Sequence, residues 1–131
     1  MQQAAVIAVR NSGAEIEVCL IRRKGAGAWG IPKGCIEPGD TSEETALNEA
    51  WEEAGINGQL VGQAIGTYEY AKSGTTLTVA VFVMRVVEEL TTWPEIRLRD
   101  RRWVPMADAA SALRRHPVWS LLDQVSARLG L

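Results

Sequence analysis

Three glutamates that lie close together, Glu49, Glu52 and Glu53, are the residues of this chain best suited to chemistry. On an α-helix each residue advances about 100°, so these carboxylates would share an arc of about 100°. Like charges at these spacings oppose helix formation modestly, and residues 41–54 contain no Lys or Arg to relieve them. The cluster is therefore either a solvated acidic face or a site for a divalent cation.

A cation site of this composition suits Mg²⁺, because Mg²⁺ takes oxygen ligands and usually keeps several waters. The backbone carbonyl of Gly34, in the loop before the helix, could add a further oxygen. Mn²⁺ accepts the same kind of ligand. A metal held in this way can neutralise phosphate charge and activate a water for attack on phosphorus. Glu53 or Glu52 would then accept the proton of that water as the general base.

Basic residues precede the acidic stretch and could bind the phosphate oxygens that the metal does not reach. They are Arg22 and Arg23, in a run that ends at Lys24, and Lys33. Three adjacent cations are often only a solvated rim, and a lysine in a loop is often only exposed. Because this run leads into the loop before the glutamates, we expect Arg22, Arg23 and Lys33 to bind substrate phosphates.

The segment that carries the glutamates has clear helix boundaries. Thr41 followed by Glu44 forms a capping box, which begins a helix. Gly55 is the residue type that ends one in the left-handed conformation. Alanines 46, 50 and 54 fall on other sides of the predicted cylinder, where they suit packing against a sheet. The sequence therefore predicts a helix from about residue 41 to Ala54.

The remaining elements follow from apolar periodicity and turn residues. In chain order, the prediction is a hairpin of strands Ala4–Val9 and Ile16–Ile21, a strand over Ile56–Gly66, a hairpin of Tyr68–Ala71 and Thr75–Val87, a surface loop over Glu88–Asp100, a short strand Arg101–Val104, a helix after Asp108 and an amphipathic helix Val118–Leu129. Strands interleaved with helices predict an α/β or α+β sandwich. At 131 residues, the chain is expected to form one domain over residues 1–131.

Composition limits the function classes. A formal net charge of −2 gives no general attraction to nucleic acid or to anionic membranes. Two cysteines are too few for a disulfide framework, and their spacing matches no zinc motif; Cys19 is expected in the core. No apolar run approaches the roughly 20 residues of a membrane span, and no signal-peptide pattern is visible. We expect a cytoplasmic protein that binds a phosphorylated small molecule, neither nucleic acid nor membrane.

The segment Gly34–Ile56 resembles the Nudix box of the Nudix hydrolases. That pattern is Gly, five residues, Glu, seven residues, Arg-Glu, an aliphatic, any residue, Glu-Glu, any residue, Gly and an aliphatic. The matching positions are Gly34, Glu49, Ala50, Glu52, Glu53, Gly55 and Ile56. Asp40 stands where the family has Glu, and Asn48 stands where it has Arg. In the family these two residues brace the loop against the helix, so their change concerns catalytic efficiency more than reaction type.

The resemblance implies a Nudix-type α/β/α sandwich, with a mixed curved sheet between helices, and hydrolysis of a nucleoside diphosphate linked to a further group. The tail Leu90–Leu122 is similar to the branch that contains diadenosine polyphosphate hydrolases and diphosphoinositol polyphosphate phosphohydrolases. The inositol-phosphate enzymes carry basic residues where this chain has Gln2-Gln3 and Lys72-Ser73-Gly74. A dinucleoside polyphosphate or nucleotide is therefore expected before a diphosphoinositol.

Several alternatives stay open at this stage. A Nudix-fold domain could bind nucleotides without hydrolysing them, or could be an isomerase, although retention of all three box glutamates favours hydrolysis. Tyr68, Tyr70 and Trp93 could stack on a base, but packing is the more common role of such residues. His116, the only histidine, precedes a proline at a helix boundary and is expected to be structural.

Overall fold

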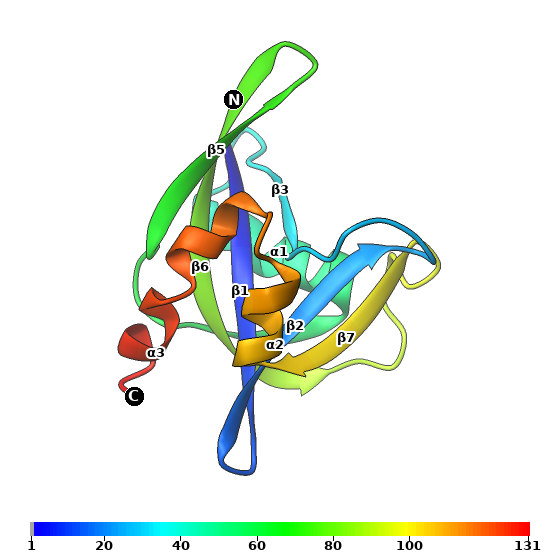
Figure 1. Ribbon diagram of the computed structural model, residues 1–131. Coiled ribbons are helices and arrows are strands. Elements are labelled where there is room, and N and C mark those ends of the chain that lie inside the picture. Colours follow the sequence, from blue (N-terminus) through cyan, green and yellow to red (C-terminus); the bar gives the residue numbers. More distant parts are fainter. Residues whose placement is uncertain (1) are drawn as a thin grey trace.

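The structure is a computed structural model that describes residues 2–131 (Figure 1). Its elements are β1 (Gln2–Ser12), β2 (Glu15–Arg23), β3 (Lys33–Cys35), α1 (Ser42–Ala54), β4 (Ile56–Leu60), β5 (Gly66–Lys72), β6 (Thr75–Glu89), β7 (Arg99–Pro105), α2 (Met106–Ala112), the 3₁₀ helix η1 (Pro117–Leu121) and α3 (Gln124–Arg128). None of the described helices is long and apolar enough to cross a membrane.

The strands form one mixed sheet. Its order is β4-β6-β1-β2-β7, and β3 and β5 pair with β1 and β6 respectively. Strands β1 and β6 run parallel from the pair Gln2–Thr78 to the pair Val9–Arg85. All the other pairs are antiparallel. Hairpins β1–β2 and β5–β6 extend from opposite ends of the molecule (Figure 1). The predicted mixed sheet is confirmed.

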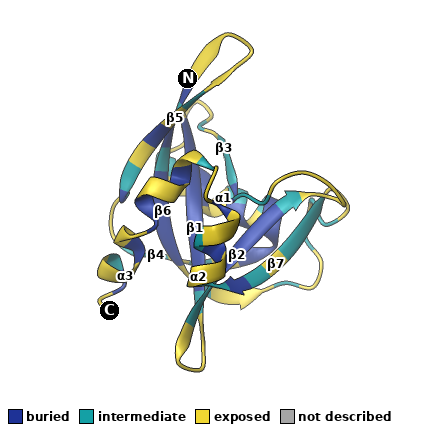
Figure 2. Cartoon of the chain, in the orientation of Figure 1, coloured by how far each residue is buried: buried dark blue, intermediate teal, exposed yellow. Residues whose placement is uncertain are grey.

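The central strand β1 is buried on both faces, which accounts for its nearly continuous apolar sequence. Because side chains alternate along a strand, Ala4, Val6 and Ala8 pack on the side of α1. Ala5, Ile7 and Val9 face a second cluster, to which α2, η1 and α3 contribute Ala109, Val118 and Val125 among others. The helices show buried inner sides and exposed outer sides (Figure 2). The predicted α/β/α sandwich is confirmed.

Helix α1 follows the predicted boundaries. The Thr41 hydroxyl accepts from the Glu44 amide at 3.0 Å, and the Glu44 carboxylate accepts from the Thr41 amide at 2.8 Å. Gly55 ends the helix with φ of 66°. Ala46, Ala50 and Ala54 of α1 are fully buried. They pack against Ala4 and Ala8 of β1, and these small side chains let the helix lie close to the strand. The acidic arc of the helix lies beside this buried face, where Glu53 accepts from the Lys33 amide of β3.

Other predictions need correction. The predicted helix Val118–Leu129 is two short elements, η1 and α3, since a 3₁₀ turn and an α-helix bury apolar residues at similar intervals and periodicity does not distinguish them. The predicted strand Ile56–Gly66 ends at Leu60, and β5 begins at Gly66. Strand β7 begins at Arg99, two residues before the predicted start, and α2 begins at Met106, immediately after Pro105.

Candidate active site

The three box glutamates lie in the C-terminal half of α1, near β3. Glu53 is buried, with 7% of its surface exposed, while Glu49 and Glu52 are half-buried. The site is thus built where α1, β3 and the start of β7 meet. A fully solvated acidic face, the alternative left open by the sequence, does not describe this helix.

Glu53 has the most constrained carboxylate of the three. Its Oε1 accepts from the backbone amide of Lys33 at 3.0 Å. Its Oε2 accepts from Nη2 of Arg99 at 2.9 Å, and Nε of Arg99 also donates to Glu95 at 3.1 Å. Both oxygens of Glu53 therefore have fixed directions before any ligand arrives.

Glu49 lies directly against Gly34. A Cβ atom on residue 34 would overlap the carboxylate of Glu49, so any other residue type would force the Glu49 side chain to move. Gly34 is not in a free loop, as the sequence suggested, because it pairs with Ala4 in the β1–β3 ladder. The backbone oxygen predicted as a metal ligand thus belongs to a strand of defined position.

Burial and neighbouring negative charges raise the pKa values of Glu49 and Glu53. Burial raises the pKa of Glu49 to about 7, and the charges of Glu53 and Glu52 act in the same direction. Burial also raises the pKa of Glu53 to about 7, although the hydrogen bond from the Lys33 amide opposes the rise. A cation placed between these carboxylates would reverse both effects, because an opposite charge favours the ionised form.

The donors present fit a hard divalent cation. Among residues 2–131, no three His, Cys, Asp or Glu side chains converge closely enough to enclose a metal ion by themselves. Mg²⁺ does not require such a cage, because it is usually bound by one or two carboxylates with waters and substrate phosphates completing its shell. The close approach of Glu49 to Gly34 and the burial of Glu53 supply oxygen ligands of this kind.

The predicted phosphate-binding residues gather beside Glu53. Arg22, Arg23 and Lys33 line one hollow of about 260 Å³ together with Glu53 and Arg99. Nζ of Lys33 donates to the Tyr70 hydroxyl at 3.0 Å. The structure therefore brings the three cationic candidates to Glu53, although they come from β2 and β3 and Glu53 from α1.

A second, wider hollow adjoins the first. Its volume is about 670 Å³, and it shares Arg22, Trp29 and Arg99 with the smaller one. Five of its lining residues are cationic: Arg22, Lys24, Arg99, Arg101 and Arg102. The guanidinium of Arg22 lies 4.5 Å from the ring centre of Trp29, at the junction. Asp100 also lines this hollow and pairs with Arg22 at 3.0 Å and with Lys24 at 3.6 Å. The surface that leads away from Glu53 is therefore rich in cations but partly neutralised.

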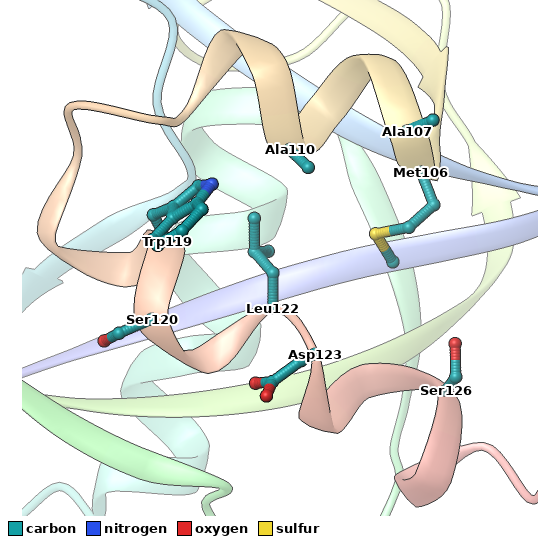
Figure 3. Close-up of a pocket in the computed structure, with 8 residues that line it drawn as sticks. All are labelled: Met106, Ala107, Ala110, Trp119, Ser120, Leu122, Asp123 and Ser126. Carbon is teal, nitrogen blue, oxygen red and sulfur yellow. The ribbon is translucent and has the colours of Figure 1, made fainter.

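A third hollow, of about 380 Å³, lies between α2 and the segment of η1 and α3, with Trp119, Met106 and Leu122 around it (Figure 3). It contains none of the predicted site residues, and its one charged lining residue is Asp123. Its shape alone does not outweigh the grouping of charged residues around Glu53, which we take as the site.

Positions 40 and 48, which brace the loop against the helix in the family, differ here both in residue type and in the contacts that they make. Nδ2 of Asn48 donates to Glu52 at 3.2 Å, one helical turn away. Within the described chain, the Asp40 side chain makes no hydrogen bond to Asn48, and its amide donates to the carbonyl of Glu37. The brace expected between positions 40 and 48 is therefore replaced by a contact within α1.

The loop after β6 contributes to the site in a way that the sequence did not reveal. The indole of Trp93 donates to the Glu53 carbonyl at 3.1 Å and packs against Gly55. The Glu95 amide donates to the Glu52 carbonyl at 3.0 Å. Trp93 therefore holds the end of α1, and the packing role applies to it as it does to the buried Tyr68.

Two further residues at the site were missed. Arg99 stood in a polar stretch that reads as surface loop, and no spacing pattern marks it. His116 was expected to be structural, yet it lines the hollow that contains Glu53 and Lys33. The His116-Pro117 pair does predict a helix start, but nothing in the sequence indicates which surface that start adjoins.

Comparison with known proteins agrees with the fold and the motif. The NUDIX domain model matches residues 1–127. Nudix hydrolase 21, chloroplastic, of Arabidopsis thaliana is 38% identical over 104 residues, which cover 76% of this chain and 52% of that protein. Nudix hydrolase 18, mitochondrial, of the same plant is 38% identical over 119 residues, covering 89% and 67%.

A solved structure of a C. elegans Ap4A hydrolase binary complex has a TM-score of 0.80 and 24% identity, and the match covers 98% of this chain and 97% of that one. At this identity the likeness concerns the fold alone. The chain belongs to the Nudix family. It spans about half to two thirds of the length of the curated relatives that it matches.

Proposed function

We propose that this chain is a metal-dependent Nudix hydrolase that cleaves a phosphoanhydride bond in a nucleoside diphosphate linked to a further group. The observation that carries the proposal is the junction of two surfaces at Glu53. On one side lie the carboxylates of Glu49 and Glu52, and on the other lies the basic hollow of Lys33 and Arg22. Oxygen ligands for a metal and cations for phosphate thus meet at one point.

In this proposal Glu49, Glu52 and Glu53 hold Mg²⁺, with the Gly34 carbonyl as a further oxygen and Mn²⁺ as a substitute. The bound metal supplies charge neutralisation and an acidified water. Lys33, Arg22 and Arg23 bind phosphate oxygens and orient the phosphate chain of the substrate for in-line attack. The amide of Lys33 and the guanidinium of Arg99 fix the Glu53 carboxylate, so its direction is set in advance.

The geometry refines the choice of general base between Glu53 and Glu52. Both oxygens of Glu53 accept hydrogen bonds from Lys33 and Arg99. Glu52 accepts one, from Asn48 to Oε1, and its Oε2 has no hydrogen-bond partner in residues 2–131. Each Glu53 oxygen keeps a second lone pair that can face a metal, but an oxygen that already accepts a hydrogen bond is a weaker proton acceptor than an unoccupied one. We therefore assign the proton-accepting role to Glu52 and a metal-holding role to Glu53.

For the substrate we propose a dinucleoside polyphosphate or a nucleotide. The adjoining basic hollows extend well beyond the space that one phosphate would need, which favours a chain of several phosphates. Trp29 and Arg22 at their junction offer a flat surface next to positive charge. The likeness of the tail to the diadenosine polyphosphate branch points in the same direction.

Two other functions are less well supported. A diphosphoinositol would need more cations near the start of β1, but Gln3 is buried there and its amide oxygen accepts from Tyr70 at 2.8 Å. A binding domain without catalysis would be expected to lose box glutamates, and none is lost here.

A substrate panel separates these functions. Diadenosine polyphosphates, nucleoside triphosphates, nucleotide sugars and diphosphoinositols are incubated with the protein and Mg²⁺ or Mn²⁺, and phosphate-containing products are quantified. We expect metal-dependent cleavage, fastest with a diadenosine polyphosphate or a nucleotide. If calorimetry shows nucleotide binding but no substrate is cleaved with any divalent ion, the proposal is contradicted and a binding domain is favoured.

A further inference from the structure

His116 is held rigidly at the start of η1. Its Nδ1 accepts from the backbone amide of Val118 at 3.0 Å, so its side chain caps the helix. Pro117 follows at the first helical position, where its fixed φ suits a helix. A residue before proline is also restricted to extended conformations, and His116 has ψ of 140°. The ring therefore has one defined position.

The cap also determines where the ring carries its proton. A backbone amide can donate only to a nitrogen with a free lone pair, so Nδ1 is unprotonated and Nε2 bears the hydrogen. Burial, and then the charge of Lys33, lower the pKa of His116 and favour this neutral form. Position 116 thus presents a neutral N–H donor at Nε2.

His116 lines the hollow that also contains Glu53 and Lys33. Nε2 and Cδ2 lie 3.7 Å from where a Cβ on Gly30 would stand, and the ring meets Tyr68 edge-on, with centres 5.6 Å apart. Nε2 has no hydrogen-bond partner among residues 2–131. Nε2 is not among the buried atoms without a partner, so this N–H is accessible to water or to a ligand in the hollow.

We propose that His116 is a substrate-binding residue whose Nε2–H donates to an oxygen of the polyphosphate chain in this hollow. The inference rests on the proposed function and extends it. Lys33, Arg22 and Arg23 attract anionic oxygens through charge, whereas a neutral imidazole adds a directional contact. Its ligand is therefore an oxygen placed along the Nε2–H direction, which fixes the register of the phosphate chain relative to Glu53.

Two substitutions separate the helix cap from the substrate contact. Asn is a good N-cap residue, and in H116N its amide oxygen can replace Nδ1 as the acceptor for Val118 while Nε2–H is lost. We expect H116N to melt above H116A, because it keeps the cap, and to keep the wild-type kcat but raise KM by about tenfold, the loss of one hydrogen bond to a charged group. H116A should lose the cap as well and melt earlier. Wild-type KM in H116N would overturn the proposal.

The unmodified protein gives an independent test. Long-range ¹H–¹⁵N NMR of the His116 ring reports which nitrogen is protonated, and magnesium-free inorganic pyrophosphate serves as the probe. We expect a proton on Nε2 and a change of the Nε2 shift on titration. A proton on Nδ1, or no change at saturation, would overturn the inference even if the enzyme is active. A change of the Nε2 shift without turnover of any substrate would support the contact and contradict the hydrolase function instead.

Discussion

The carboxylate of Glu49 occupies the space in which a side chain on residue 34 would stand. The contact joins β3 to α1 across a loop of the chain. It explains why glycine begins the box in this protein: residue 34 must leave room for a carboxylate, and this steric contact, not a positive φ, imposes the requirement.

Gly34→Ala should displace Glu49 and lower turnover and Mg²⁺ affinity by about 10–100-fold, the range for disturbed ligand support. The measurements are kcat/KM with the best substrate and Mg²⁺ affinity by calorimetry.

Gly39→Ala, in the loop between β3 and α1, is the matched control. Gly39 has φ of 90°, and nothing lies within 4 Å of an added Cβ, so the substitution strains the backbone without touching Glu49. We expect it to lower stability by about 1 kcal/mol and to leave Mg²⁺ affinity unchanged. Equal effects of the two substitutions on metal binding would contradict the steric explanation.

Arg99→Gln should destabilise the metal-free protein. Arg99 is the ion-pair partner of the buried Glu53, and its side chain is 31% exposed. Because removing one partner leaves a buried carboxylate uncompensated, while partial exposure softens the penalty, we expect a loss of about 1–2 kcal/mol in unfolding free energy. Urea denaturation in EDTA measures it, and Mg²⁺ should restore part of the loss. Arg97→Gln, at an exposed neighbour without a salt bridge in the described chain, should change little.

The raised pKa of Glu49 predicts a specific pH dependence. The folded protein binds the proton more tightly than the unfolded chain, since the pKa rises from 4.5 to about 7. Stability of the metal-free protein therefore falls as pH increases through this interval. Glu49→Gln has no proton to lose, so it should match the wild type near pH 4.5 and be the more stable protein at pH 8. A difference that does not grow with pH would contradict the assigned environment of Glu49.

Asn48→Arg restores the residue type of the family pattern. Asn48 is exposed and donates one hydrogen bond, to Glu52. An arginine there can still reach carboxylates on the same turn, so we expect kcat/KM to stay the same or to rise. A large loss would show that the site depends on the Asn48–Glu52 contact, and Asp40→Glu in the same background tests whether the original brace can be rebuilt.

The parts of this structure that the sequence predicts are those set by local chemistry. Thr41, Glu44 and Gly55 determine where α1 begins and ends, and each acts through backbone groups within a few residues. The spacing of the three glutamates likewise depends on one helix. Strand β1 was recognisable because a strand buried on both faces is apolar throughout.

The parts that the sequence did not predict depend on contacts between distant segments. Arg99 reaches Glu53 across 46 positions of the chain, and no local pattern encodes such a pairing. His116 reaches the hollow only because η1 packs beside β5. The division of the C-terminal region into η1 and α3 was missed because both fit one apolar period.

The central claim is that the box glutamates perform metal-dependent hydrolysis. The most direct measurement compares turnover of the best panel substrate by the wild type and by Glu53→Gln, each with and without Mg²⁺. Gln keeps an acceptor for the Lys33 amide, so circular dichroism should show an intact fold. We predict Mg²⁺-dependent turnover by the wild type and a loss of at least about 100-fold in the variant. Near-normal turnover by Glu53→Gln would contradict the account.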